Sequence, residues 1–344
     1  MAGGCAPAPL AVSTGEATRG GARPSGGTSV LDIDPATYTP HPSHGADRTW
    51  TETNCYHDIW VEMLHALGDD PLAMGGYVAA CDFDGSQWTL FKPPTEDVRR
   101  LYGIDVAELN VWRPVEDHIE EQLGYGRLLT VEVDAYHLPD TAGVSYRLAH
   151  TKTTIVPNRL DRSGRRLGYF HGPGYFEVEG ADLDGLWGAS PLAPYTETVR
   201  LDGMDRRAAD LVADAVDVTR RHLGERPATN PVARLADRLE RDVPWLMKAD
   251  MDTFHQYAFG TCRQCGAAAQ VLADHAAWLE EHGVPGLRGA MDDLRAVAEG
   301  AKSLQFTLAR ASLRSRVPDI AGLTSDMAAG WERALRLLDD RLPR

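Results

Sequence analysis

A lone cysteine, Cys55, stands at the start of what the residue pattern predicts to be an amphipathic helix. Apolar side chains recur at helical spacing between Tyr56 and Leu67, and Gly68 ends the run. A thiol at a helix N-terminus meets free backbone N–H groups and the positive end of the helix dipole, and both favour the thiolate. Because the thiolate is the nucleophile, this position suits cysteine catalysis. The pattern is equally compatible with Cys55 as a small buried hydrophobic residue.

A cysteine nucleophile needs a base, and the base needs an orienting partner. His150 directly precedes a β-branched run that predicts a strand, where its ring can be held rigidly and can lean toward a helix packed on the sheet. His171 follows the next predicted strand, residues 166–170. A cysteine on an early helix, a histidine at a strand start and a polar residue on the following strand make up the papain-like chain order.

The oxyanion formed during acyl transfer needs a second donor beside the backbone N–H of Cys55. Asn54 carries the nearest side-chain amide in the sequence. The same residue is equally well explained as the N-cap of the predicted helix.

Composition places the chain among globular proteins and excludes several classes of function. At 344 residues it has room for two domains, or for one large core with an appendage. The net charge of −15 argues against a general binder of nucleic acid or of anionic membranes. The five scattered cysteines do not resemble a disulfide framework and favour a reducing cytoplasm. No apolar stretch could span a bilayer, and residues 1–29 lack the pattern of a secretory signal.

The chain divides by pattern into three parts. Residues 1–39 predict a disordered tail that is rich in small and polar residues near its start. Residues 40–195 combine short helices with later strands, which predicts an α+β domain with a mostly antiparallel sheet. Residues 196–344 predict an α-helical C-terminal domain. The expected strands are residues 87–91, 128–134, 151–156, 166–170 and 175–178, and the expected C-terminal helices are 205–222, 231–246, 254–282, 289–314 and 325–342.

Several stretches carry a resemblance to known families. Residues 126–139, GRLLTVEVDAYHLP, resemble a stretch of the butirosin-type acyltransferases, in which an apolar strand runs into Asp, Tyr and Leu-Pro. In that pattern a histidine then opens a hydrophobic strand, as His150 does here, and a hairpin returns, as at residues 171–173. From about residue 40 to 342 the chain is similar to the bacterial family called domain of unknown function 1839, through residues 54–56, 109–114 and 263–266.

The resemblance implies a papain-like, cysteine-peptidase-type domain followed by the helical domain. It implies an acyltransferase that takes an acyl or aminoacyl group from a carrier-protein thioester onto Cys55 and passes it to a small amine acceptor. The acyl group would arrive on the phosphopantetheine arm of the carrier, so no further cofactor is expected. By position, Cys55 corresponds to the nucleophile and His150 to the base.

The third position departs from the family pattern, because His171 stands where an Asp is expected. A neutral imidazole can accept a hydrogen bond from His150, but it cannot stabilise an imidazolium as a carboxylate does. Asp134, on the adjacent strand and within the matched stretch, is the reserve candidate for this role. Its alternative role is to cap a strand end.

Two other functions are compatible with the same residues. A thioesterase or amidase would use the same cysteine and histidine but admit water to the acyl-enzyme. A non-catalytic binding protein could keep the fold without the chemistry, and the departure at His171 leaves that alternative open. The helical C-terminal half could cover the site and exclude water, which favours transfer.

Four arginines cluster on the hairpin between the candidate catalytic strands: Arg159, Arg162, Arg165 and Arg166. Carrier proteins are acidic, so this basic segment is a candidate docking surface, and a solvated turn is the alternative.

Two residues of the C-terminal half, His255 and Gln264, could line an acceptor pocket, although a packed interdomain helix would explain them as well. Cys262 and Cys265 form a C-x-x-C pair inside the same helical pattern. No second cysteine pair completes a zinc tetrahedron, so neither a metal site nor a redox motif is expected there.

Overall fold

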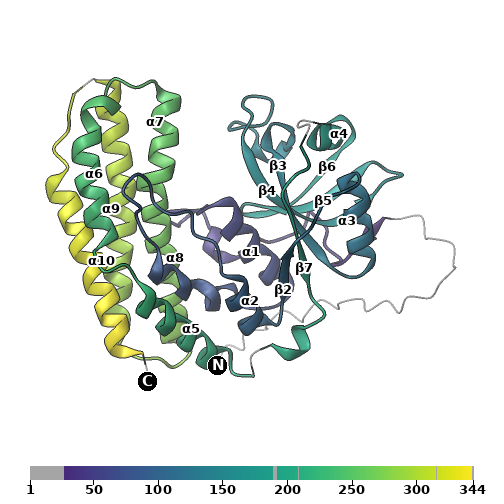
Figure 1. Cartoon of the computed structure of the whole chain (residues 1–344), viewed down its shortest axis with the longest axis horizontal. Coiled ribbons are helices and arrows are strands. Elements are labelled where there is room, and N and C mark those ends of the chain that lie inside the picture. Colours follow the sequence, from purple (N-terminus) through teal and green to yellow (C-terminus); the bar gives the residue numbers. More distant parts are fainter. Residues whose placement is uncertain (1–26, 189–191, 208, 315, 343–344) are drawn as a thin grey trace. The chain divides into compact units, whose positions relative to one another are not determined.

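The computed structural model describes residues 27–188, 192–207, 209–314 and 316–342 (Figure 1). The chain forms two compact units that alternate along the sequence. Among the described residues, unit 1 contains 27–42, 58–71 and 98–207, and unit 2 contains 43–57, 72–97 and the chain from 209 onward. The α+β character and the helical C-terminal region that the sequence predicts are both present.

Unit 1 is built on an antiparallel sheet of seven strands in the order β2-β7-β3-β4-β5-β6, with β1 paired to β4 (Figure 1). The long strand β4 pairs with β3 through its first half and with β5 through its second half. A register shift between Pro157 and Arg159 separates the two halves. The strands are β1 (Thr28–Ser29), β2 (Asp105–Glu108), β3 (Leu128–Asp134), β4 (Lys152–Asp161), β5 (Arg166–His171), β6 (Gly174–Glu179) and β7 (Thr196–Arg200).

Helices flank this sheet. α3 (Val115–Gly124) packs against β3 and β4, and α4 (Gly180–Gly188) directly follows β6. α1 (Cys55–Ala66) forms where the spacing predicts a helix, with Ile59, Trp60, Met63 and Leu64 fully buried. Its polar face is not exposed as expected, because Asp58 and Glu62 are fully buried as well. Gly68 ends it with a φ of 79°, a left-handed conformation that suits glycine at a helix C-terminus. α2 (Thr95–Tyr102) follows, and two 3₁₀-helices, Pro42–His44 and Pro71–Ala80, lie in the same part of the chain.

The boundary predicted at residue 195 is wrong, because β7 lies between β2 and β3 inside the sheet of unit 1. Its register pairs Thr198 with Leu129 on one side and with Ala107 on the other. The segment Thr196–Arg200 is polar and short, so its residue pattern alone does not predict a central strand. Unit 1 therefore continues to residue 207.

The predicted disordered tail, residues 1–39, is partly wrong. Thr28 and Ser29 pair with Leu160 and Arg159 of β4. The side chain of Asn158 then accepts from the backbone N–H of Leu31 and donates to its carbonyl oxygen. These contacts fix the chain from residue 28 onward, and residues 1–26 lie outside the described part.

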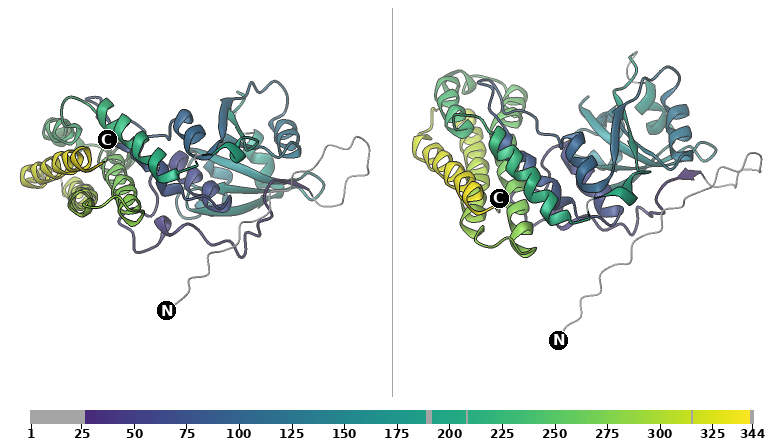
Figure 2. Two further views of the ribbon diagram at one scale, coloured as in Figure 1. Left: turned by 90° about the horizontal axis from the view of Figure 1, so that it is seen from below. Right: turned by 60° about the horizontal axis from the view of Figure 1, so that its bottom comes forward.

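Unit 2 consists mainly of helices that run side by side (Figures 1 and 2). Small residues permit close approach of α9 and α10, since a Cβ on Gly300 would meet the side chain of Met327 at 2.8 Å. Asn230 caps α6 by accepting from the N–H groups of Val232 and Ala233. The helices are α5 (Leu211–Glu225), α6 (Pro231–Leu246), α7 (Met251–Ala258), α8 (Gln264–Glu281), α9 (Arg288–Leu313) and α10 (Ala321–Arg341). One turn of π-helix, Phe259–Arg263, joins α7 to α8.

Two early segments belong to unit 2, so the continuous 40–195 domain is a further correction. The backbone of Trp50 exchanges two hydrogen bonds with the side chain of Gln270 in α8, at 2.9 and 2.7 Å. Its indole Nε1 donates to the carbonyl of Ala298 in α9. Residues 72–97 are held by an ion pair between Asp82 and Arg234. The strand expected at 87–91 is absent from this described segment, where a single bridge joins Phe83 to Trp88.

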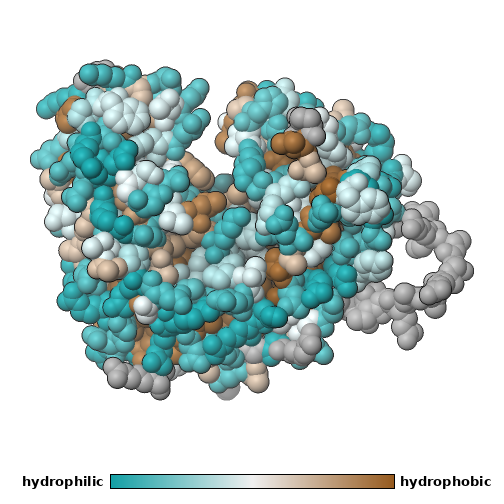
Figure 3. All heavy atoms as spheres, in the orientation of Figure 1, coloured by the Kyte–Doolittle hydropathy of each residue, from teal (hydrophilic) through white to brown (hydrophobic). Residues whose placement is uncertain are grey.

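The visible surface is mostly hydrophilic, with scattered hydrophobic residues (Figure 3). None of the described helices combines the length and the apolar character needed to cross a membrane.

Candidate functional site

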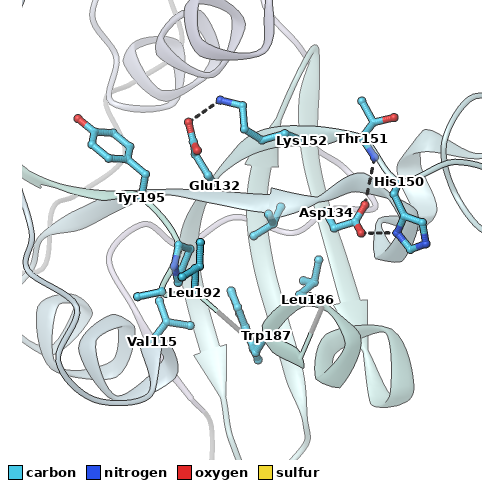
Figure 4. Close-up of a pocket in the computed structure, with 13 residues that line it drawn as sticks. Val115, Glu132, Asp134, His150, Thr151, Lys152, Leu186, Trp187, Leu192 and Tyr195 are labelled. Atoms are coloured by element: carbon cyan, nitrogen blue, oxygen red, sulfur yellow. Dashed lines mark hydrogen bonds and ion pairs between the residues drawn. The ribbon is translucent and has the colours of Figure 1, made fainter. Parts of the chain in front are cut away.

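His150 and Asp134 form a hydrogen-bonded pair at the end of β3 and the start of β4 (Figure 4). The distance between His150 Nδ1 and Asp134 Oδ2 is 2.6 Å. The strand register places them together, because Asp134 pairs with Lys152, two residues after His150. The side chain of His150 is 73% exposed while that of Asp134 is 16% exposed. With Nδ1 bonded to the carboxylate, Nε2 is the nitrogen that can exchange a proton with a reacting group.

The ring of His150 is also held by an aromatic contact. It stacks on Tyr136, with ring centroids 4.5 Å apart and the planes 15° from parallel. The guanidinium of Arg147 lies 5.5 Å from the centre of the Tyr136 ring. Arg147 in turn pairs with Asp182 of α4. Carboxylate and tyrosine together fix the orientation of an otherwise exposed histidine.

Asp134 both caps a turn and orients His150, so its two predicted roles coexist. Its Oδ1 accepts from the backbone N–H groups of Tyr136 at 3.0 Å and Thr151 at 3.2 Å, which leaves Oδ2 to His150. Partial burial raises the pKa of Asp134, but these hydrogen bonds outweigh it and hold the pKa below its usual value. The carboxylate is therefore ionised at neutral pH and can stabilise an imidazolium on His150.

The hypothesis that His171 orients His150 is wrong. His171 is buried, and its Nδ1 lies 2.5 Å from Oδ2 of Asp140 while its Nε2 lies 2.8 Å from Oγ1 of Thr153. Both ring nitrogens are thus occupied by other partners. Asp140 also accepts from the hydroxyl of Tyr169. This buried network connects the loop after β3 to strands β4 and β5.

Cys55 is the first residue of α1, as predicted, and its side chain is partly exposed. Asn54 fulfils the N-cap alternative, because its Oδ1 accepts from the N–H groups of Tyr56 at 3.1 Å and His57 at 2.9 Å. Its Nδ2 donates to the carbonyl of Phe91. Cys55 belongs to unit 2 and His150 to unit 1, so their pairing, and a role of Asn54 toward an oxyanion, stay predictions.

A pocket of about 410 Å³ opens beside the His150–Asp134 pair, within unit 1. Glu132, Lys152 and Tyr195 form its polar side, and Glu132 Oε1 lies 2.6 Å from Lys152 Nζ. Apolar side chains occupy the other side (Figure 4). They are Val115, Leu186, Trp187 and Leu192. Neither this pocket nor the stacking of Tyr136 on His150 is among the features predicted from the sequence. The spacing of two residues from Asp134 to Glu132 and to Tyr136 is the signal that points to them.

Three of the four clustered arginines form surface ion pairs with nearby carboxylates. Arg162 pairs with Asp117 and Glu120 of α3. Arg165 pairs with Asp184, and Arg166 lies 3.1 Å from Glu179. Arg159 lies on β4 with intermediate exposure. Exposed ion pairs of this kind exchange partners at little cost, so carrier docking by Arg159, Arg162, Arg165 and Arg166 stays a prediction.

The two candidates of unit 2 differ in their surroundings. His255 is exposed on α7 and packs edge-on against Phe254. Gln264 is buried at the start of α8, and neither its Oε1 nor its Nε2 has a hydrogen-bond partner among the described residues. Buried amides normally have partners, so Gln264 is open to a ligand or to ordered water.

Cys262, in the π-helical turn, and Cys265, at the start of α8, have the properties of packed side chains. Burial raises the pKa of Cys262 and of Cys81 to about 12, and it raises the pKa of Cys265 as well. Within the described part of the chain, no group of three His, Cys, Asp or Glu side chains is arranged to hold a metal ion.

Comparison with known proteins gives matches to two family models. The model of the DUF1839 N-terminal domain matches residues 39–201, and that of the DUF1839 C-terminal domain matches residues 208–340. The junction between the two matches agrees with the end of unit 1 at residue 207. No curated protein matches the chain.

Proposed function

The chain belongs to the DUF1839 family, and for it we propose a cysteine-dependent acyltransferase that acts through an acyl-Cys55 intermediate on a papain-like domain. The donor is the thioester of an acyl or aminoacyl carrier protein, and the acceptor is an amine. The observation that carries the proposal is the His150–Asp134 pair, an exposed imidazole with its orienting carboxylate already in place at 2.6 Å. An exposed imidazole held by a carboxylate through Nδ1 leaves Nε2 available to act as a general base.

The proposed reaction has two halves that balance in protons. In the first, His150 Nε2 takes the proton of the Cys55 thiol, sulfur attacks the thioester carbonyl, and the tetrahedral intermediate collapses to acyl-Cys55. The carrier thiolate leaves and takes the proton from His150. In the second, the amine attacks acyl-Cys55, the proton it loses passes to His150, and Cys55 leaves as a thiolate that is reprotonated. Asp134 stabilises the imidazolium in both halves.

The N-terminus of α1 supports the assignment of Cys55 as nucleophile. The thiol is partly exposed, whereas Cys81, Cys262 and Cys265 are buried. The backbone N–H groups of the first turn, together with the helix dipole, favour negative charge on sulfur and on an oxyanion beside it.

Intact mass spectrometry tests the proposal. The protein is incubated with acyl- and aminoacyl-carrier proteins, with Cys55→Ala as the matched variant. We expect a mass increase equal to the acyl group in the wild type and none in Cys55→Ala, and much slower loading in His150→Ala. If no donor loads the wild type and its Cys55 also resists alkylation near neutral pH, the nucleophile assignment fails. Addition of amines then distinguishes transfer from hydrolysis. An amide product indicates an acyltransferase, whereas loss of the acyl-Cys55 adduct without an amide product indicates a hydrolase.

A further inference from the structure

The polar side of the pocket in unit 1 carries an excess of carboxylates. Glu132 and Asp134 line it directly, against the single ammonium of Lys152. The hydroxyl of Tyr195 donates to Glu197 Oε1 at 2.9 Å. Tyr195 is 40% exposed, and partial desolvation, the hydrogen bond to Glu197 and nearby carboxylates that include Glu132 raise its pKa to about 12. The local field therefore favours positive charge.

Glu132 can exchange its present partner for a ligand. Its side chain is 23% exposed, whereas that of Lys152 is 66% exposed. An ion pair with so exposed a lysine contributes little to stability, so Lys152 can turn into solvent at little cost. The carboxylate would then accept a hydrogen bond from a bound ammonium without remaining unpaired.

The opposite side of the pocket suits an apolar group. Leu186 and Trp187 come from α4, Val115 from the start of α3, and Leu192 from the segment before β7. Leu192 is 77% exposed, which is unusual for a large aliphatic side chain and leaves apolar surface for a ligand to cover. A volume of about 410 Å³ is enough for a small molecule with one ring or a short alkyl chain.

From this arrangement we infer that the pocket binds an apolar primary amine, with the ammonium on Glu132 and the apolar body against Leu186, Trp187 and Leu192. Under the proposed function, on which this inference rests, the molecule is the acyl acceptor. The bound ammonium must first release one proton to solvent, and the neutral amine then attacks. The pocket lies beside His150, which takes the second proton, the one lost during the attack. The inference thereby names the chemical class of the acceptor.

Titration calorimetry on the full chain without any acyl donor tests the inference. The probes are 2-phenylethylamine, its neutral counterpart 2-phenylethanol, the anion 3-phenylpropanoate, and the polar amine ethanolamine. We expect 2-phenylethylamine to bind at least tenfold more tightly than each of the others. Glu132→Gln should weaken its binding about tenfold or more, since a hydrogen bond to a charged group contributes about 1.5–3 kcal/mol. Lys152→Met should leave its binding unchanged or strengthen it, because a competing cation is removed.

Glu179→Gln is the matched control, since Glu179 lies on β6 of the same unit and outside the pocket, with Arg166 as its partner. It should leave the affinity unchanged. Equal affinity for the amine and the carboxylate, or no effect of Glu132→Gln, would overturn the inference. The calorimetry contains no acyl donor, so it tests amine binding independently of the loading of Cys55. If the amine does not bind but Cys55 is loaded normally, only this inference fails. If the amine binds but Cys55 is not loaded, the proposed function fails instead.

Discussion

Nδ1 of His150 lies 2.6 Å from Oδ2 of Asp134, across the ends of two neighbouring antiparallel strands. The carboxylate of Asp134, and not the buried imidazole of His171, is the group that orients His150. This matters chemically, because a carboxylate stabilises an imidazolium and a neutral imidazole does not.

Asp134→Asn should reduce kcat for acyl transfer by about 10²–10⁴-fold with little change in KM. An asparagine amide that donates to Nδ1 would fix the wrong tautomer of His150, and it removes the charge that stabilises the imidazolium. Steady-state kinetics with a saturating donor measure the effect. Asp161→Asn is the matched control, because Asp161 caps a hairpin turn through Gly164 and Ser163 without contacting a histidine. Equal losses in both variants would show that capping, not orientation, is what matters.

The pH dependence of stability should differ between the wild type and Asp134→Asn. The pKa of Asp134 is lowered in the folded protein, so its carboxylate contributes stability above its unfolded pKa of about 3.9. That contribution is lost as pH falls through the lower, folded pKa. We expect the wild type to be more stable than the variant near neutral pH and the difference to shrink below about pH 4, measured by urea unfolding at several pH values. A difference that is constant with pH would contradict the lowered pKa.

His171→Leu should destabilise the fold and spare the chemistry of the molecules that remain folded. Removal of the imidazole leaves the side chain of Asp140, which is 5% exposed, without one of its hydrogen-bond partners. Breaking a buried pair in this way costs about 3–5 kcal/mol. Urea unfolding measures the loss, and kcat per folded molecule should stay within about threefold of the wild type. The double variant His171→Leu/Asp140→Leu keeps the test informative, because it removes both buried polar groups and should recover part of the stability. A kcat that falls as far as in Asp134→Asn would restore a catalytic role to His171.

Asn54→Ala should lower the free energy of unfolding by about 1–3 kcal/mol, from loss of the cap of α1 and of the donor to Phe91. Asn54→Ser retains an acceptor for the helix N–H groups and should recover about half of that loss. Kinetics of the two variants also test the oxyanion role of Asn54. If Asn54→Ser regains stability and keeps the wild-type kcat, its amide does not act on the oxyanion.

Alkylation should distinguish Cys55 from the buried thiols. In a Cys5→Ala background, iodoacetamide near pH 8 should add one carbamidomethyl group within minutes, and peptide mapping should place it on Cys55. Cys81 and Cys262, with pKa values of about 12, should react only after unfolding in urea. Labelling of Cys262 in the native protein at a similar rate would contradict the burial of that segment.

The sequence by itself determined the features that depend on nearby residues. The start of α1 at Cys55, the cap at Asn54, the strands β3 to β6 and most C-terminal helices follow from periodicity, capping residues and turns within a few positions. The family could likewise be identified from short stretches of residues. His150 and Asp134 were both among the candidates, because each lies at the end of a strongly patterned strand.

Only the tertiary structure decided which candidates meet. The register of β3 and β4 brings Asp134 to His150. Asp140 lies in the loop after β3 and forms a hydrogen bond with His171, a contact that no local sequence pattern predicts. Arg162 and Arg165 form ion pairs with carboxylates on α3 and α4. β7 lies in the sheet between β2 and β3, which are far from it in the sequence. Each of these outcomes depends on contacts between distant residues. Hydrophobic burial and hydrogen-bond satisfaction across the whole fold decide them, and the propensity of a local segment does not.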